Sequence, residues 1–201
     1  GQKEDSRWSQ GTDGCPDGID DLTALAASDI NSFWQSEFAD QGANYSPPRG
    51  FQPYRSIIET ACGPTAPNNA FYCPADNSIY FDRSFLDTEL KQTGDFGPVF
   101  ILAHEWGHLV QAELGILQDP RRFTIQSELQ ADCLAGVYTK SAGDRQLLQE
   151  GDLQEAISSL LAAGDPQGTP WYDPQAHGSA QQRVDAFRNG IDGGVQTCLG
   201  I

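Results

Sequence analysis

The sequence is poor in basic residues and contains no methionine. Its 12 lysines and arginines stand against 28 aspartates and glutamates, which gives a formal net charge of -16. Nucleic acids and anionic membranes repel so acidic a chain, and we expect neither as a partner. Because no initiator methionine is present, we expect a processed or trimmed product, which fits export.

Long apolar runs are also missing. No stretch reaches the roughly 18 residues that a membrane-spanning helix needs, so we expect no insertion into a membrane. A chain of 201 residues with 38% hydrophobic side chains is large enough for one domain with its own core. No repeat or domain linker is evident. We therefore expect a flexible, Gly- and Asp-rich arm over residues 1–18, one domain over residues 19–201, and a monomer.

The five cysteines contain no Cys-x-x-Cys pair, which argues against a cysteine-bound structural zinc. Cys62 and Cys73 bracket a Pro-containing loop with little apolar content, and we predict a disulfide between them. Cys15, Cys133 and Cys198 cannot all pair, and a bond from Cys15 to Cys198 would tie the termini together. Disulfides indicate a secreted or extracytoplasmic protein.

The most informative motif is His104-Glu105-Trp106-Gly107-His108, which has the pattern H-E-x-x-H. On a helix this spacing puts two imidazoles on one face with a carboxylate beside them, an arrangement that holds zinc and activates water. Apolar residues surround the motif and Pro98 suits a first helical turn, which indicates a buried helix. The alternative is that both histidines are packed core residues.

A third ligand must come from elsewhere. Only three histidines occur, and Leu114 stands where a third histidine would follow on the same segment. Without methionine there is no Met-turn, so the metzincin class is excluded. A carboxylate from a second helix remains, and Glu128 and Asp132 share a helix face four residues apart. We favour Glu128 as the ligand and Asp132 as the partner of a ligand histidine, over a solvated acidic face.

With these residues in place, the sequence resembles the gluzincin arrangement and, more specifically, a family of bacterial neutral zinc metallopeptidases. The resemblance implies zinc at His104, His108 and Glu128, Asp132 behind a ligand, and a Cys133–Cys198 disulfide. It also implies that Glu105 is the general base and that His177 stabilises the transition state. The matching stretches are 71–74 with 79–82, 104–108, 128–136 and 177–183, within residues 51–200.

The chemistry also follows from the residues. Bound zinc lowers the pKa of water to about 7, and Glu105 can take the proton and pass it to the leaving amine. His177 precedes a helix start marked by a Ser179–Gln182 capping-box pattern, and is the candidate second donor to the oxyanion. A surface histidine in a Gly-containing turn is the alternative.

Three further residues are candidate substrate contacts. Tyr80 and Tyr172 can donate hydrogen bonds to a substrate. Arg183 can bind substrate or brace an acid, and a structural salt bridge is an equal alternative. We expect 78–82, with Tyr80 at its centre, to be an edge strand that holds the substrate extended; a core-covering hairpin is the alternative.

The predicted fold is α+β, a single zincin-like metallopeptidase domain with an N-terminal helix, a small sheet and a helical zinc-binding core. A turn-rich stretch, 163–174, is expected to form a wall of the cleft. The expected helices are 20–38, the motif helix, 123–138, 152–163 and 179–189, and the expected strands are 51–60, 70–73 and 78–82, the last two forming a hairpin.

The predicted function is a zinc-dependent peptidase, an endopeptidase acting on peptides or proteins. One alternative is a catalytically silent, zinc-stabilised peptide-binding domain, and another is an amide hydrolase acting on cell-envelope material. The presence of Glu105 favours the enzyme over the silent binding domain, because a structural zinc site needs no general base.

Overall fold

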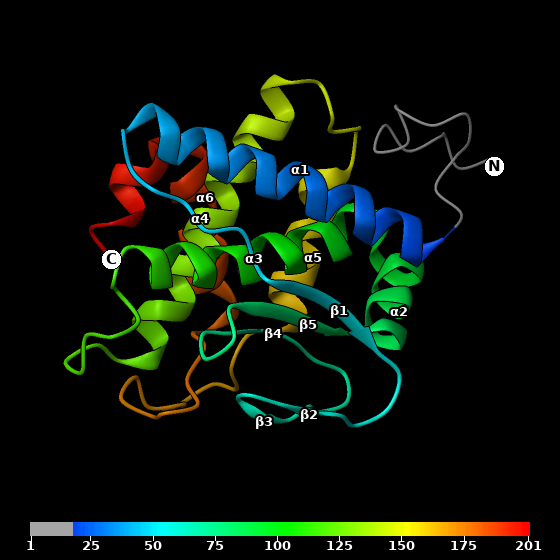
Figure 1. Cartoon of the computed structure of the whole chain (residues 1–201), viewed down its shortest axis with the longest axis horizontal. Coiled ribbons are helices and arrows are strands. Elements are labelled where there is room, and N and C mark those ends of the chain that lie inside the picture. The colour runs from blue at the N-terminus through cyan, green and yellow to red at the C-terminus, as the bar shows by residue number, and fades with distance from the viewer. Residues whose placement is uncertain (1–17) are drawn as a thin grey trace.

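The computed structural model describes residues 18–201, so residues 1–17 of the predicted arm, including Cys15, lie outside it. The described chain confirms the α+β class: one helix, a group of short strands, then five helices (Figure 1). The boundary between arm and domain stays a prediction.

The elements are α1 (Ile19–Asp40), β1 (Gly50–Tyr54), β2 (Glu59–Thr60), β3 (Gly63–Pro64), β4 (Ala70–Cys73), β5 (Ser78–Asp82), α2 (Arg83–Thr93), α3 (Phe96–Glu113), α4 (Thr124–Asp144), α5 (Asp152–Ala162) and α6 (Ala180–Cys198).

Helix α3, which carries the H-E-x-x-H motif, lies at the centre of the core. It packs against α1, α2, α4, α5 and strand β4, and its apolar sequence leaves most of its side chains buried. Figure 1 shows α1 running beside α3, with the strands on the other side of α3. The motif is therefore held on a rigid, enclosed element, as the apolar residues around it predicted.

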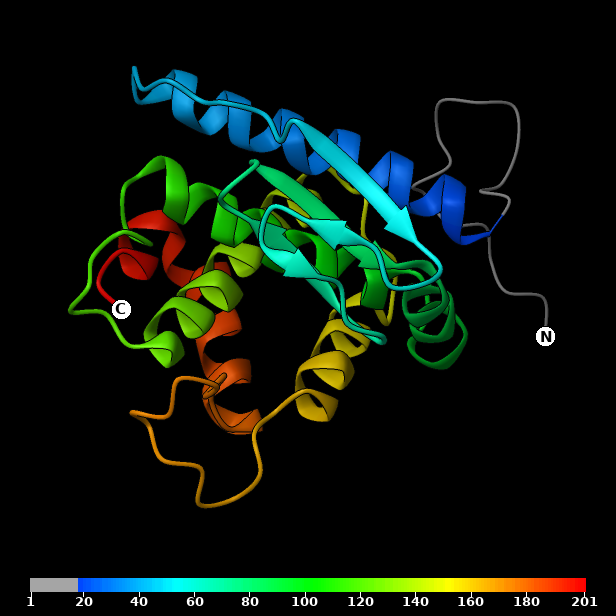
Figure 2. The same ribbon diagram turned by 60° about the horizontal axis from the view of Figure 1, so that its bottom comes forward.

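The main sheet has the order β1-β5-β4, with β1 parallel to β5 and β4 antiparallel to β5. The predicted hairpin of β4 and β5 is confirmed. The prediction that Ser78–Asp82 is an edge strand is wrong, because β1 pairs with its other side. All five residues of this strand are buried. The edge next to α3 is β4 instead (Figure 2).

The predicted strand 51–60 is divided into two pieces. β1 ends at Tyr54, and the chain then turns into the small β2–β3 hairpin. Ile58 and Thr65, which flank this hairpin, hold its open end together. The Thr65 amide donates to the Ile58 carbonyl at 2.9 Å, and the Ile58 amide donates to the Thr65 hydroxyl at 3.0 Å.

Two disulfides join the described residues. Cys62–Cys73 is confirmed and ties the β2–β3 hairpin to the end of β4. Of the pairings left open, the structure has Cys133–Cys198, which joins α4 to the end of α6. No helix within residues 18–201 is both long and apolar enough to cross a membrane.

The C-terminal helices α4 and α6 pack closely enough to require glycine. A Cβ added at Gly190 would lie 1.8 Å from the Cys133 carbonyl oxygen, and one added at Gly136 would lie 2.1 Å from that of Phe187. The capping box at Ser179 and Gln182 is confirmed at the start of α6. This contact brings the acidic face of α4 and the start of α6 to one place.

Candidate metal centre and active-site cleft

The imidazoles of His104 and His108 converge on the carboxylate of Glu128. His104 Nε2 lies 3.0 Å from Glu128 Oε2, and His108 Nε2 lies 3.4 Å from Glu128 Oε1. One ligand atom from each of the three residues lies within 4.8 Å of the others, a grouping able to hold a metal ion. The four-residue spacing on α3 supplies the two imidazoles, and the neighbouring α4 supplies the carboxylate.

His104 is supported from behind by a buried ion pair. Its Nδ1 lies 2.7 Å from Oδ1 of Asp132, a residue with no exposed surface. Arg183 donates to both oxygens of Asp132, from Nε at 2.8 Å and from Nη2 at 2.9 Å. Because the carboxylate accepts, His104 Nδ1 carries the proton and its Nε2 faces Glu128.

The same contacts shift the pKa values of the pair. Burial alone raises the pKa of the Asp132 carboxyl, but Arg183 and His104 outweigh it and hold that pKa below its ordinary value. Burial lowers the pKa of His104, but Asp132 and Glu128 outweigh it and raise that pKa to about 10. The metal-free protein therefore holds a proton between the imidazoles and Glu128.

His108 has a neutral support. Its Nδ1 lies 2.8 Å from Oε1 of the fully buried Gln111, one helical turn further along α3. The Gln111 amide nitrogen donates to the Ser127 carbonyl at 2.8 Å and to Gln130 Oε1 at 2.9 Å. Since Gln111 Oε1 can only accept, His108 Nδ1 carries the proton, and Nε2 again faces Glu128.

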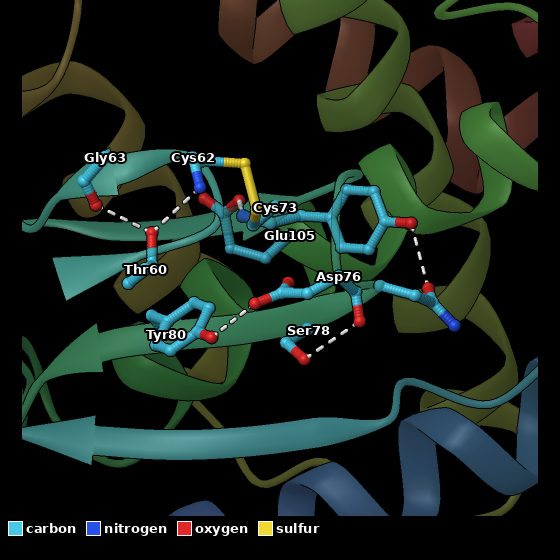
Figure 3. Close-up of a disulfide and its surroundings, with 10 residues drawn as sticks. Thr60, Cys62, Gly63, Cys73, Asp76, Ser78, Tyr80 and Glu105 are labelled. Carbon is cyan, nitrogen blue, oxygen red and sulfur yellow. Dashed lines mark hydrogen bonds between the residues drawn. A yellow bond between two sulfur atoms is a disulfide. The ribbon is translucent and has the colours of Figure 1, made fainter.

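Glu105 lies beside this group without joining it. Its side chain is buried, and Oε2 accepts a hydrogen bond from the Tyr72 amide of β4 at 2.9 Å. Burial raises the pKa of the Glu105 carboxyl, against the opposing effect of the two histidines. Figure 3 shows Glu105 near the end of β4 that carries the Cys62–Cys73 disulfide.

A cavity of about 810 Å³ opens over these residues. It is lined by α2, β4, one side of α3, α4 and the end of α5. Its lining residues include Phe100 and Ile101 of α3, before the motif, and Leu117 and Asp119, beyond the end of that helix. Such a concave site, with polar groups at its base, has the form of a substrate cleft.

The family model for proteins described as putative neutral zinc metallopeptidases matches residues 2–199. The chain belongs to this family. Among its relatives, the uncharacterized protein YpfJ of Escherichia coli is 36% identical over 195 residues, which cover 86% of this chain and 68% of YpfJ. The uncharacterized protein Rv2575 of Mycobacterium tuberculosis is 36% identical over 165 residues, which cover 68% of this chain and 56% of Rv2575. No solved structure matches the chain significantly.

His177 also lines the cavity. Its side chain is 48% exposed, with Nδ1 3.6 Å from Asp165 Oδ1. The amides of His177 and Gly178 both donate to Asp165 Oδ2, at 2.7 and 2.8 Å. Asp165 therefore fixes the backbone of this loop, while the imidazole stays accessible to a ligand in the cavity.

The structure places the three candidate substrate contacts in different surroundings. Tyr80 is buried and donates to Asp76 Oδ2, and Tyr172 is exposed on the surface; within residues 18–201 neither lines the cavity. Arg183 lines it, but its guanidinium is occupied by Asp132 and, from Nη1, by the Ala163 carbonyl at 3.1 Å. This contact agrees with the expected ion pair of Arg183 with an acid, and its substrate role stays a prediction.

Three contributors to this site were not among the residues predicted from the sequence. Gln111 follows His108 by three residues, so helical spacing alone could have identified it. Asp165 lies 12 residues before His177, and the Tyr72 amide lies 33 residues before Glu105. No local pattern indicates these two, because each contact depends on how distant segments pack.

Proposed function

We propose that the chain is a zinc-dependent peptidase in which His104, His108 and Glu128 hold the metal. The observation that supports this most strongly is the convergence of two Nε2 atoms and one carboxylate beside a buried glutamate that binds none of them. Family membership supports the same metal and reaction class.

The donor set fits zinc. Two imidazole nitrogens and one carboxylate oxygen are the ligands of many catalytic zinc sites, which keep a further position for water or substrate. Bound there, zinc would supply a Lewis acid and lower the pKa of water. The protonated Nδ1 atoms of His104 and His108 leave the Nε2 lone pairs for the metal once the shared proton is lost.

Glu105 acts as the general base and then as the acid. It follows a ligand by one residue, so it lies next to the reacting atoms without occupying a ligand position. Its carboxylate takes a proton from the attacking water and delivers it to the nitrogen of the leaving amine. The hydrogen bond from the Tyr72 amide fixes one carboxylate oxygen and leaves the other for this transfer.

Asp132 and His177 have supporting roles. Asp132 orients His104 and is itself held by Arg183. His177 lines the same cavity and donates a hydrogen bond to the oxygen that gains negative charge when the peptide carbonyl is attacked. The hydrogen bond from the His177 amide to Asp165 fixes the loop that carries the imidazole, which supports that role.

Peptide substrates bind extended along β4. This strand ends the sheet order, lines the cavity and lies against α3, so its outer edge is the one able to pair with substrate main chain. A cavity that continues on both sides of the metal centre accommodates residues on both sides of the cut, which supports endopeptidase action. Two disulfides support an extracytoplasmic location.

The test uses a diverse peptide mixture, zinc-loaded protein and mass spectrometry. The wild type is expected to cleave, and Glu105→Gln is expected to keep zinc but lose the cuts. Glu150→Gln, an exposed residue away from the cavity, is the matched control and should cleave normally. Cleavage by Glu105→Gln at the wild-type rate would refute the general-base role. Bound zinc without any cleavage by the wild type would refute the peptidase and favour a silent peptide-binding domain.

A further inference from the structure

The cavity continues past the metal centre toward the N-terminal end of α3. Its walls there are mainly apolar, formed by Phe85 of α2, Phe100 and Ile101 of α3 and Ala162 of α5. Glu89 of α2 lies among them and also lines the cavity. This end of the cleft therefore combines an apolar wall with a carboxylate.

Glu89 has no basic partner in the described part of the chain. Its Oε2 accepts a hydrogen bond from the Ser159 hydroxyl at 3.0 Å, and no ion pair to Glu89 forms within residues 18–201. The two basic residues of α2 are both engaged elsewhere, Lys91 with Asp87 and Arg83 with Asp20. A carboxylate partly enclosed by apolar side chains gains from a cation that the protein does not supply.

Glu89 lies far enough from the candidate metal centre that only a long substrate side chain can reach it. Ser159 Oγ, its partner, lies 3.3 Å from where a Cβ on Gly97 would stand. Gly97 precedes His104 by seven residues, which is about 10 Å along the helix axis. A substrate residue bound near the metal reaches that level only with an extended side chain.

Other acids lie near this end of α3. Asp95, Asp152 and Glu155 have carboxylate oxygens within 4.8 Å of one another, and Glu155 Oε2 accepts from the Phe96 amide at 2.8 Å. Glu155 precedes Ser159 by one turn of α5. These charges add to the negative potential that Glu89 gives this end of the cleft, which attracts a cationic group.

From these observations we propose that this part of the cavity is a specificity pocket for the lysine or arginine side chain of a substrate residue next to the cleaved bond. The aliphatic stem of that side chain lies against Phe85, Phe100 and Ile101, and its charged head donates to Glu89. The inference rests on the proposed peptidase function and adds a substrate class, peptides with a basic residue at one fixed position beside the cut.

The experiment compares two peptide pools with zinc-loaded enzyme and mass spectrometry. The pools are identical, except that one contains lysine where the other contains norleucine, which has a similar length and no charge. The wild type is expected to cut the lysine pool about tenfold faster, always at a fixed position relative to lysine. Glu89→Gln should abolish this ratio, and Glu89→Lys should favour glutamate-containing peptides instead. Glu150→Gln should keep the wild-type ratio.

The outcomes separate the two proposals. Cleavage by the wild type without preference for lysine, or a preference that survives in Glu89→Gln, would overturn the specificity pocket and leave the peptidase standing. No cleavage of either pool by the wild type would overturn both. A lysine preference that disappears in Glu89→Gln and persists in Glu150→Gln supports both.

Discussion

The two histidines of the motif share one helix face but are fixed by different chemistry. His104 is backed by Asp132, whose charge is balanced by Arg183 from α6. His108 is backed by Gln111 from its own helix, whose amide continues to Gln130 of α4. Both supports protonate Nδ1 and turn Nε2 toward Glu128. A buried ion pair and a neutral amide can thus orient a ligand histidine in the same way. The two supports differ in how much stability the protein loses when a partner is removed.

The expected loss of stability is greater on the His104 side. A buried charge that loses its partner is left without water or a counter-ion, whereas a broken neutral hydrogen bond leaves only a dipole unsatisfied. The His104 support also joins three helices, α3, α4 and α6, while the Gln111 support joins α3 mainly to α4. Substitutions on the two sides should therefore differ in size and in pH dependence.

The largest effect is expected for Asp132→Asn. The new amide group faces the Arg183 guanidinium, donor against donor, and leaves a buried cation unpaired. The free energy of unfolding of the metal-free protein should fall by about 3–5 kcal/mol, measured by urea denaturation. Zinc affinity should fall about 10–100-fold, because His104 loses the partner that orients it.

A double substitution separates these two effects. Asp132→Leu with Arg183→Met removes both charges, so most of the lost stability should return while zinc affinity stays low. If Asp132→Asn alone were as stable as the wild type, the ion pair would not be the sensitive side of the site.

A smaller effect is expected for Gln111→Leu. The substitution removes the acceptor of His108 Nδ1 and the donor to the Ser127 carbonyl, which should lower the free energy of unfolding by about 1–3 kcal/mol. Zinc affinity should fall less than in Asp132→Asn. Gln154→Leu, at an exposed glutamine of α5, is the matched control and should change neither quantity. A greater loss of zinc in Gln111→Leu than in Asp132→Asn would reverse the comparison.

The smallest expected effect is a shift in the pH dependence of zinc binding. Asp132 and Glu128 raise the pKa of His104 to about 10, so zinc must displace a proton and its affinity should rise with pH across the neutral range. The raised pKa of His104 also increases the free energy of unfolding of the metal-free protein. This contribution is complete below about pH 6.5, the ordinary pKa of histidine, and is lost as the pH rises toward 10.

Chelator competition from pH 5.5 to 11, a range that includes the raised pKa of His104, measures this difference. In Asp132→Asn the rise should level off at lower pH than in the wild type, since one source of the raised pKa is gone. In Gln111→Leu it should level off where the wild type does, because Gln111 carries no charge. Equal shifts in both variants would contradict the distinction between charged and neutral support.

Local patterns predicted the parts of the fold that depend on local spacing. Helix α3 with its motif, the acidic face of α4, the capping box of α6 and the β4–β5 hairpin follow from helical period, turn residues and adjacency. Helix α2 escaped prediction because only Leu86 among its residues is fully buried, although Asp82 caps it by accepting from the Ser84 amide.

Contacts across long sequence separations were not predictable in this way. The strand order depends on β1 pairing with β5 across the intervening β2–β3 hairpin and β4, and this pairing puts Tyr80 inside the sheet instead of at its edge. The Asp132–Arg183 pair spans 51 residues, and sequence alone left Arg183 between substrate binding and bracing an acid. In each case tertiary packing selected one of several locally acceptable arrangements.

The central claim is that His104, His108 and Glu128 hold one zinc ion. X-ray absorption spectroscopy of the zinc-loaded protein, with metal content measured alongside, tests it most directly. The predicted result is one zinc per chain with a nitrogen and oxygen environment containing two imidazoles, and much weaker retention of zinc in Glu128→Ala. Sulfur in the zinc environment, or undiminished binding by Glu128→Ala, would contradict it.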